Sequence, residues 1–407
     1  MPSEQVETLI IGGGQAGLTM SHSLKQRGLA HLVLERHRIG ERWRSERWDG
    51  LKFQFPNWSV RLPEFSFRHD EPDAFSGTDA IVKFIETYAA FIDPPIRCGV
   101  DVKRLRQREP GAGFVAETSD GVVTANNVVV ATGPYQRPLM PDLLRDETIF
   151  QVHASRYLNP EQLPPGAVLV VGSGASGAQI AEELYRVGRR VYLSVGRHTR
   201  LPRRYRGRDL IWWLGAMGID QTTVEARGPA RLLPVISGAY GGHTIDFRRF
   251  AAEGVTLLGR LQAACDGVIY FAPDLAESLA NGDAIYATFL DMVDAHVERN
   301  GLNLPEDLAA RALLPDPLCV AVPLRCLDLR TEGIGAVIWA TGYGVDFSWI
   351  EIPVLDPRGE PVHRGGITGV PGLYFLGLQW LSKMSSSFLS GVGDDAAVLA
   401  DHIAART

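Results

Sequence analysis

Residues 8–18 have the sequence TLIIGGGQAGL, and this stretch decides the fold of the 407-residue chain. Its apolar start predicts a buried strand, and the glycines at 12, 14 and 17 follow in Gly-x-Gly-x-x-Gly spacing before a helical pattern. Gly12 permits the tight turn out of the strand, Gly14 allows a pyrophosphate to approach the backbone, and Gly17 lets the helix pack closely against the sheet. The free N–H groups at the start of the helix attract phosphates. The stretch therefore predicts a dinucleotide-binding unit, which also includes Gln15 and Ala16.

An acidic residue follows at the distance that this unit requires. The next predicted strand, at residues 31–34, ends at Glu35, close to the interval of about 20 residues at which an acid meets the ribose hydroxyls. Glu35 and its neighbour Arg36 are therefore candidate cofactor-binding residues. The alternative is a glycine-rich loop in an ordinary α/β protein, and the strand, the helix and the acid together argue against it.

The same pattern occurs again in the middle of the chain. Residues 167–177, AVLVVGSGASG, combine a buried strand with a second Gly-x-Gly-x-x-Gly turn. We assign cofactor binding in this turn to Gly172, Gly174, Ala175, Ser176 and Gly177.

The second unit ends differently from the first. Its next strand, at residues 190–195, is followed by Arg197 instead of an acid, with Arg200, Arg203 and Arg204 close behind. An acid favours a free 2′-hydroxyl, whereas arginine accommodates a 2′-phosphate. The first unit therefore suits FAD or NAD, and the second favours NADPH, with NADH as the alternative. A solvated loop is the other interpretation of these arginines.

Two such units imply that two dinucleotides meet, and the productive pair is a nicotinamide hydride donor with a flavin acceptor. We therefore predict an α/β fold with two Rossmann-like dinucleotide-binding domains. The FAD-binding domain is discontinuous and comprises residues 1–157 and 325–407, and the NAD(P)H-binding domain comprises residues 158–324. A partly helical elaboration at about 205–310 belongs to the second domain, because residues 273–300 show helical spacing.

Composition narrows the class of protein. The net charge of -6 argues against a nucleic-acid partner. No apolar run reaches the ~18 residues that a transmembrane helix needs, and the first strand begins almost at once, which leaves no room for a signal peptide. We therefore expect a cytoplasmic protein with no membrane partner. The sequence leaves a homodimer open.

The cysteines argue against one kind of redox centre. Cys98, Cys265, Cys319 and Cys326 form no Cys-x-x-Cys pair, and no His/Cys cluster has the spacing of a metal site. We therefore expect four reduced, mostly buried thiols, no active-site dithiol and no metal.

Further motifs extend the candidate site. An aromatic loop contains Trp43, whose ring serves either as core or as a wall against a flat cofactor. Two predicted strands end in Ala-Thr-Gly, where glycine permits a sharp passage between domains. Asp394 begins the last predicted helix, where an acid suits either a flavin or simple N-capping. These motifs add the following candidate cofactor-binding residues: Trp43, Arg44, Ala131, Thr132, Gly133, Ala340, Thr341, Gly342, Tyr343, Gly393 and Asp394.

Together, these motifs resemble the flavin-containing monooxygenases, and the bacterial members best. The resemblance covers nearly the whole chain in the same order, and only the region 205–310 lacks a strong motif. It implies FAD and NADPH as cofactors, with O2 and a small organic molecule as substrates. It also implies that one oxygen atom is inserted through a C4a-hydroperoxide of the flavin, with N- or S-oxygenation favoured. Val102 is included among the flavin-binding candidates. The matching segments are residues 12–17, 43–44, 131–133, 172–177, 339–343 and 391–396.

The chain departs from the family pattern in two places. The family has Phe-x-Gly-x-x-x-His-x-x-x-Tyr or Phe; His153 and Tyr157 keep the second half, whereas Glu147 and Ile149 replace the phenylalanine and the glycine. Gln54 stands where the family often has an asparagine near the flavin. Gln54, His153 and Tyr157 are the candidate catalytic residues, and His153 either positions the nicotinamide or joins the domains. The departures leave three alternatives: a reductase or oxidase that passes electrons to a quinone or O2, a Baeyer–Villiger-type oxygenase, and a flavin-bearing redox sensor.

Overall fold

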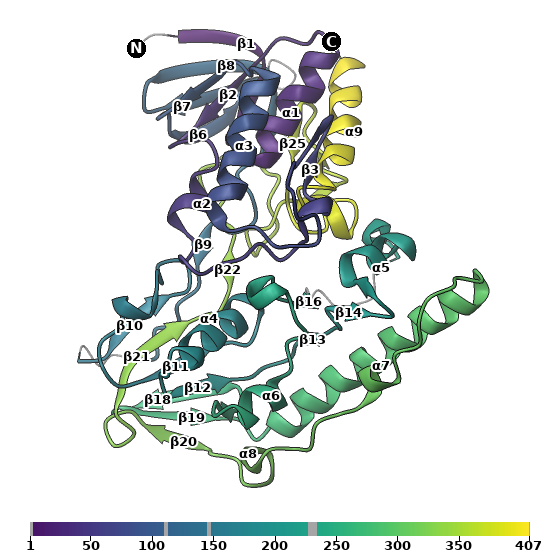
Figure 1. The fold of residues 1–407 in the computed structure, drawn as a ribbon. Helices are drawn as coiled ribbons and strands as arrows, with labels where there is room; N and C mark the ends of the chain where they lie inside the picture. Colours follow the sequence, from purple (N-terminus) through teal and green to yellow (C-terminus); the bar gives the residue numbers. More distant parts are fainter. Residues whose placement is uncertain (1–2, 110–112, 145–147, 227–233, 407) are drawn as a thin grey trace.

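The computed structural model describes residues 3–109, 113–144, 148–226 and 234–406, which form two α/β domains on separate, largely parallel sheets (Figure 1). The predicted fold class, with two Rossmann-like domains, is confirmed. Glu147 lies outside the described residues.

The sheet of the first domain has the strand order β23-β24-β25-β8-β1-β2-β5. Its parallel centre consists of β25 (Leu373–Phe375), β8 (Gly121–Val130), β1 (Ser3–Ile11), β2 (His31–Glu35) and β5 (Ile96–Cys98). The antiparallel additions are β6 (Val102–Gln107), β7 (Phe114–Thr118), β23 (His363–Arg364) and β24 (Ile367–Thr368). The first glycine turn follows the carboxyl end of a central strand, β1, which is where open parallel sheets bind ligands.

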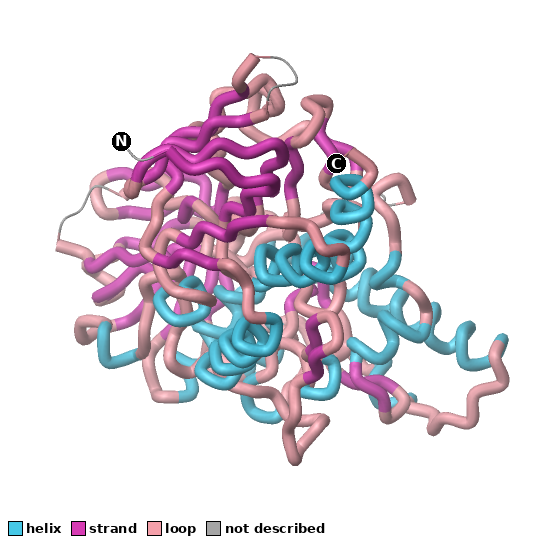
Figure 2. The backbone as a smooth tube through the Cα atoms, turned by 90° about the horizontal axis from the view of Figure 1, so that it is seen from above, coloured by secondary structure: helices cyan, strands magenta, loops and turns pink. Residues whose placement is uncertain are grey.

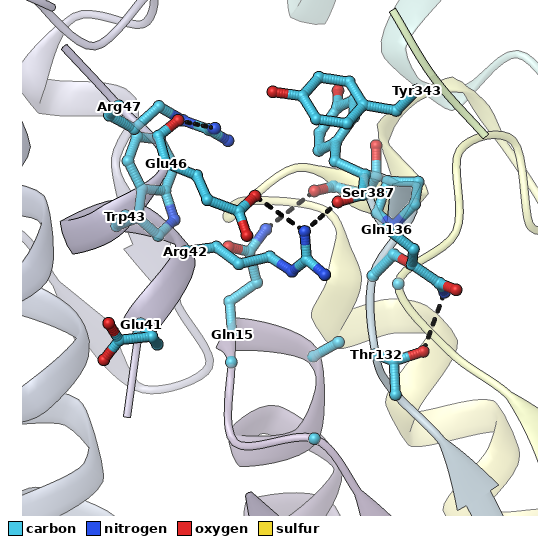
Figure 3. A pocket seen from close by; sticks show the side chains of 18 of the residues that line it. Gln15, Glu41, Arg42, Trp43, Glu46, Arg47, Thr132, Gln136, Tyr343 and Ser387 are labelled. Carbon is cyan, nitrogen blue, oxygen red and sulfur yellow. Dashed lines mark hydrogen bonds and ion pairs between the residues drawn. The ribbon is translucent and has the colours of Figure 1, made fainter. Parts of the chain in front are cut away.

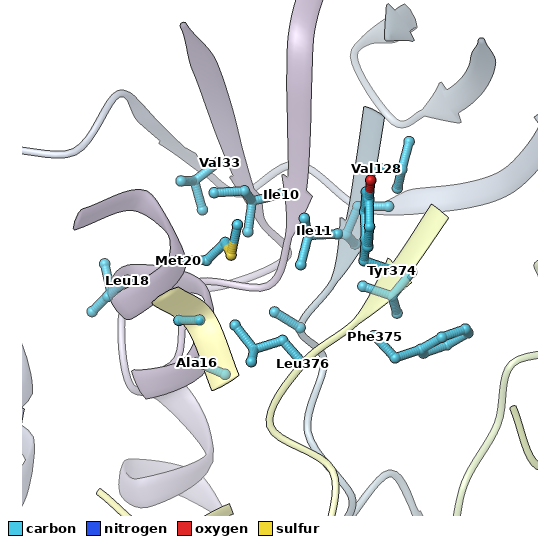
Figure 4. Close-up of a cluster of buried hydrophobic side chains, with 14 of the residues drawn as sticks. Ile10, Ile11, Ala16, Leu18, Met20, Val33, Val128, Tyr374, Phe375 and Leu376 are labelled. Atoms are coloured by element: carbon cyan, nitrogen blue, oxygen red, sulfur yellow. The ribbon is translucent and has the colours of Figure 1, made fainter. Parts of the chain in front are cut away.

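Helices and sheet enclose the core of this domain. The helix α1 (Gln15–Gln26) lies between α3 (Thr78–Ile92) and α9 (Val392–Ala404) (Figure 1). Leu18 of α1 belongs to the same buried cluster as Ile10 of β1 and Val33 of β2 (Figure 4). Since Leu9, Ile10 and Ile11 at the end of β1 are all buried, both faces of this part of the strand are covered, and this explains its apolar run.

The second domain repeats this plan. Its sheet has the order β10-β21-β11-β12-β17, and every neighbouring pair is parallel. The strands are β10 (Phe150–His153), β21 (Ile334–Trp339), β11 (Ala167–Val171), β12 (Val191–Ser194) and β17 (Thr256–Leu258). The helix α4 (Ala175–Arg186) follows β11 through the second glycine turn. Both turns therefore occupy equivalent places at the carboxyl end of a central parallel strand.

The strand arrangement differs from the domain limits drawn from the sequence. Residues 150–153 and 334–339 were assigned to the first domain, yet as β10 and β21 they pair within the second sheet. The chain therefore passes between the domains near residues 134–144 and 340–346. These two passages pair with each other, because β9 (Arg137–Pro138) is antiparallel to β22 (Tyr343–Gly344).

The elaboration predicted at 205–310 is in two pieces, because β17 belongs to the central sheet. One piece contains α5 (Leu210–Ala216) and α6 (Phe247–Ala252), and the other contains the 25-residue helix α7 (Leu275–Arg299). The helix α7 extends beyond the rest of the molecule in both views (Figures 1 and 2). The remaining short elements are α2 (Glu41–Ser45), α8 (Leu318–Ala321), β3 (Arg61–Leu62), β4 (Phe65–Ser66), β13 (Thr199–Arg200), β14 (Arg204–Tyr205), β15 (Arg208–Asp209), β16 (Pro234–Val235), β18 (Leu261–Cys265), β19 (Val268–Phe271) and β20 (Cys326–Asp328).

The cysteines are all free thiols, but the expectation that most are buried is wrong. Cys98, Cys265 and Cys326 are exposed, because each lies at the end of an edge strand. No helix in the described ranges combines the length and the apolar composition needed to cross a bilayer.

Candidate functional site

A cavity of about 1310 Å³ lies where the two domains face each other, and both glycine turns line it. Pockets for single small ligands usually measure about 300–1,000 Å³, so this one has room for more than one ligand. The predicted residues that line it are Gly12, Gly14, Gln15, Ala16, Glu35, Arg36, Trp43, Gln54, Val102, Ala131, Thr132, Gly133, His153, Gly174, Ala175, Ser176, Ala340, Gly342 and Tyr343. The predicted residues outside its lining are Gly17, Arg44, Tyr157, Gly172, Gly177, Arg197, Thr341, Gly393 and Asp394.

The three glycines of the first turn have distinct environments. A Cβ on Gly12, whose φ is +115°, would lie 2.5 Å from the carbonyl oxygen of Ala131, and a Cβ on Gly17 would lie 1.8 Å from that of Gly12. A Cβ on Gly14 would meet nothing within 4 Å. Gly12 and Gly17 are therefore required by packing, whereas Gly14 faces open space at the N-terminus of α1. This arrangement fits a bound pyrophosphate.

Glu35 closes one side of this turn. Its Oε2 accepts a hydrogen bond from the N–H of Gly13 at 2.6 Å, and its Oε1 accepts one from the N–H of His37 at 2.8 Å. Since each carboxylate oxygen has more than one lone pair, both oxygens retain capacity for ribose hydroxyls. The two backbone N–H groups thus orient the Glu35 carboxylate toward the predicted site of the ribose hydroxyls.

The second turn has nearly the same geometry. A Cβ on Gly172, whose φ is +107°, would lie 2.4 Å from the carbonyl oxygen of Ala340, and one on Gly177 would lie 1.8 Å from that of Gly172. A Cβ on Gly174 again meets nothing within 4 Å. The end of the next strand differs, because the N–H of Gly196 donates to Oγ of Ser173 at 3.0 Å instead of a carboxylate being present there.

Two arginines of the predicted phosphate-binding group have other partners. Arg200 is buried and forms an ion pair with Asp246 at 2.6 Å. Arg203 is buried as well, and its Nη2 lies 2.7 Å from Oδ1 of Asp209. Since both charges are already neutralised by carboxylates, neither side chain is placed to serve a 2′-phosphate.

The other two arginines are exposed. Arg204 donates to the carbonyl oxygen of Gly242 at 2.8 Å. Arg197 follows β12, at the carboxyl edge of the second sheet, beyond the cavity lining. Arg197 therefore keeps the position predicted for binding a 2′-phosphate, next to the second turn.

The two Ala-Thr-Gly segments form the passages between the domains. Gly133 and Gly342 have φ values of +75° and +85°, which favour glycine because it lacks a Cβ. The N–H of Leu139 donates to the carbonyl oxygen of Gly342 at 3.0 Å, and Gln136 donates to Oγ1 of Thr132 at 3.0 Å (Figure 3). Oγ1 of Thr341 donates to the carbonyl of Leu139, so this threonine serves the passage itself.

His153 joins the end of β10 to the second passage. Its Nε2 lies 3.0 Å from the carbonyl oxygen of Gly342, and its Nδ1 accepts from the N–H of Ser155 at 3.1 Å. A carbonyl only accepts, so the ring carries its proton on Nε2. Burial lowers the pKa of His153, which keeps the ring neutral. Its ring centroid is 5.0 Å from that of Tyr343, and both line the cavity.

Tyr157 lies outside the cavity, although it was a candidate catalytic residue. It is fully buried, and its hydroxyl donates to Oε2 of Glu183 on α4 at 2.6 Å. Burial raises the pKa of Tyr157 and that of Glu183. A Cβ on Gly50 of the first domain would lie 1.9 Å from Oε1 of the same carboxyl group. Tyr157 therefore belongs to the packing between the domains.

Gln54 lines the cavity from the first domain while it contacts the second. Its Nε2 donates to the carbonyl oxygen of Ile236 at 3.3 Å, and Nη1 of Arg203 donates to its backbone carbonyl at 2.6 Å. Gln179 of α4, which sequence reasoning missed, donates to the same Ile236 carbonyl at 2.8 Å.

The segment predicted as an aromatic loop contains the short helix α2, and it contributes a wall and a charged pair to the cavity. Trp43 lines the cavity, and its ring centroid is 5.5 Å from that of Phe53. Arg44 points elsewhere and forms an ion pair with Glu86 of α3. The neighbouring Arg42 and Glu46 were missed; Nη1 of Arg42 donates to Oε2 of Glu46 at 2.8 Å inside the cavity (Figure 3). Their i, i+4 spacing on one helix face was an available signal.

The start of the last helix lies beside the cavity. Gly393 and Asp394 do not line it, and the carboxylate of Asp394 forms an ion pair with Lys383. The loop before this helix does reach the cavity through Ser387, whose carbonyl oxygen accepts from Nε2 of Gln15 at 2.9 Å (Figure 3).

The sequence of this chain is similar to those of several known oxidoreductases. A sequence profile described as pyridine nucleotide-disulphide oxidoreductase matches residues 9–209. An uncharacterized CzcO-like oxidoreductase of Geobacillus kaustophilus is 36% identical over 403 residues, which cover 98% of each chain. The rice indole-3-pyruvate monooxygenase YUCCA1 is 30% identical over 57% of this chain and 59% of its own length. The chain belongs to the family of CzcO-like oxidoreductases.

Solved structures of the flavin monooxygenase family share the fold. A flavin monooxygenase from Stenotrophomonas maltophilia has a TM-score of 0.66 at 18% identity, covering 99% of both chains. An ornithine N-hydroxylase from Kutzneria has a TM-score of 0.62 at 16% identity, also covering 99% of both chains. At this identity the two structures show that the chain shares their fold. As a relative of the CzcO-like oxidoreductases, the chain is an oxidoreductase.

Proposed function

We propose that this chain oxidises NADPH and transfers one oxygen atom of O2 to a nitrogen or sulfur atom of a small organic substrate, with FAD as its cofactor. For each substrate molecule, one NADPH and one proton are consumed, one oxygen atom enters the product, and the other leaves as water.

The observation that carries this proposal is that two equivalent glycine turns open onto one cavity. Gly14 and Gly174 each leave free space at a helix N-terminus, where backbone N–H groups bind phosphate. Such a pair supports two dinucleotides whose reactive ends meet between the domains. A flavin bound there supplies the two-electron chemistry and the activation of O2.

The residues of the chain divide the binding tasks between the two turns. Glu35 is oriented by two backbone N–H groups, which suits ribose hydroxyls and supports FAD at the first turn. The second turn has no such acid, and Arg197 lies beyond the strand that follows it, which supports NADPH there.

The remaining cavity residues hold the site and exclude water. His153 is neutral, and its Nε2–H donates a hydrogen bond to the carbonyl oxygen of Gly342 in the second passage. Its role is therefore to join β10 to that passage near the cavity. Trp43, Phe53 and Tyr343 line the cavity with aromatic rings. Apolar walls of this kind keep water from the reacting groups.

The test is substrate-stimulated NADPH oxidation in the presence of labelled oxygen gas. We expect a substrate that stimulates turnover to yield a product that is heavier by one labelled oxygen atom. If all consumed NADPH appears as hydrogen peroxide for every sulfide and amine tried, the proposal is refuted.

A second candidate is an NAD(P)H-dependent reductase or oxidase that passes electrons to a quinone or to O2. It is favoured by Ile149, which replaces the glycine of the family pattern and is buried in an apolar cluster. Rapid quinone reduction without oxygenated product would support it. A ketone that yields an ester would instead support Baeyer–Villiger chemistry, in keeping with a Streptomyces coelicolor Baeyer–Villiger monooxygenase that is 31% identical over 44% of this chain.

A further inference from the structure

One wall of the cavity consists of aromatic rings, and two of them, Phe55 and Phe388, have no role in the proposed function. The ring centroids of Phe53 and Phe55 are 5.3 Å apart, and those of Phe55 and Phe388 are 5.0 Å apart, both in edge-to-face geometry. All three side chains line the cavity and are half-buried. They come from opposite ends of the chain, so the wall is a product of the fold.

Backbone contacts fix both segments that carry this wall. Nε2 of Gln15 holds the carbonyl oxygen of Ser387, and the N–H of Phe388 donates to the carbonyl of Ser385 at 2.8 Å. On the other side, Arg203 holds the backbone carbonyl of Gln54, between the two phenylalanines. A wall that is ordered in advance loses less conformational entropy when a ligand binds.

Polar groups next to the wall are uncharged amides. Gln54 and Gln179 both direct Nε2 to the carbonyl of Ile236, and no donor among the described residues reaches either amide oxygen. The buried charge of Arg203 is matched by Asp209, and Lys52, which lines the same cavity, is exposed to solvent and needs no buried counter-charge. Because an unpaired charge is costly to bury, this part of the cavity favours a neutral ligand.

We propose that Phe55 and Phe388 bind the ring of an uncharged aromatic substrate, with the amides of Gln54 and Gln179 facing its polar group. This inference rests on the proposed function and names the class of substrate that the cavity selects. Edge-to-face and stacked contacts with phenylalanine suit a ring of the size of benzene.

The experiment compares Phe388→Ala and Phe55→Ala with wild type on three sulfides: methyl phenyl sulfide, dimethyl sulfide and (methylthio)acetate. We expect each variant to lower kcat/KM for methyl phenyl sulfide about ten-fold, while dimethyl sulfide changes little and the flavin content is retained. Phe91→Ala is the matched control, because Phe91 is 53% exposed on α3 and outside the cavity lining.

Three results would overturn the inference. Loss of flavin from Phe388→Ala would show that the wall binds the flavin and not the substrate. A wild-type preference for (methylthio)acetate that Lys52→Ala abolishes would assign the site to an anion. Unchanged binding of methyl phenyl sulfide in both variants would remove the wall from recognition. Binding followed through the flavin absorbance needs no turnover, so it tests the wall even if the wild type yields no oxygenated product.

Discussion

Replacing Gly14 by alanine separates cofactor binding from folding at the first turn. Gly14 has φ -84° and ψ -171°, an extended conformation that alanine adopts without strain, and its Cβ would meet no atom within 4 Å. Two small effects on stability oppose each other. Alanine is a poorer N-cap than glycine, which destabilises the helix. Replacing a glycine also lowers the conformational entropy of the unfolded chain, which stabilises the fold by about 0.4–1 kcal/mol. We therefore expect the unfolding free energy of the apoprotein to change by less than about 0.5 kcal/mol.

The same methyl group occupies the space where a pyrophosphate is expected. Loss of one charge-assisted hydrogen bond costs about 1.5–3 kcal/mol, which corresponds to a 10- to 150-fold weaker Kd for FAD. Gly17→Ala is the opposite case. Its Cβ would lie 1.8 Å from the carbonyl oxygen of Gly12, where ordinary contacts begin at 3.4 Å. That overlap should destabilise even the apoprotein by about 1–3 kcal/mol or more.

Gly174→Ala is the matched variant at the second turn. Its Cβ would also meet nothing within 4 Å, so we expect it to raise KM for NADPH by a similar factor and to leave FAD affinity intact. The assays are FAD titration of the apoprotein by fluorescence, chemical unfolding of the apoprotein, and NADPH kinetics of the FAD-loaded protein. If Gly174→Ala weakens FAD binding while Gly14→Ala leaves it within about two-fold of wild type, the assignment of the two turns is refuted.

Three further predictions concern single side chains. Tyr157→Phe removes the donor to the half-buried carboxyl of Glu183 and should cost about 1–3 kcal/mol of unfolding free energy, with kcat per bound flavin retained. The control Tyr185→Phe, whose hydroxyl donates to an exposed acid, should cost less, and a fall in kcat at unchanged stability would contradict this role of Tyr157. Arg197→Ala should lower kcat/KM about ten-fold more for NADPH than for NADH, and equal losses would exclude a 2′-phosphate role. Burial lowers the pKa of His198, so the unfolded chain binds more protons below about pH 6.5. The unfolding free energy should therefore decrease as the pH is lowered through that range, and less steeply in His198→Asn, as pH-dependent urea melts would measure. Equal slopes in the two proteins would contradict the assignment.

Much of the cofactor site could be predicted because its determinants are local. A strand, a glycine turn and a helix lie within about 20 residues, and the spacing of the glycines follows from steric limits on the backbone. The structure gives Gly12 and Gly17 their predicted packing roles and leaves Gly14 open. The second turn repeats this geometry for the same reason.

Residues whose role depends on distant partners could not be assigned in this way. Arg203 follows the second unit as a phosphate-binding arginine would, yet Asp209 neutralises it and Gln54 of the other domain accepts from it. Tyr157 matches a family motif, yet its hydroxyl is buried against Glu183 on α4. Nothing in the spacing of either residue indicates whether it faces solvent, a cavity or a carboxylate.

Both dinucleotide-binding units, and the acid of the first, could be predicted from local sequence, since strand, turn and helix are adjacent along the chain. The assignment of β10 and β21 to the second sheet, and the set of side chains that share one cavity, depend on the tertiary fold. The wall of Phe55 and Phe388 is the clearest case, because its rings are 5.0 Å apart in space while their segments lie near opposite ends of the chain. Contacts of that kind arise from packing over the whole fold, so the local spacing of residues does not predict them.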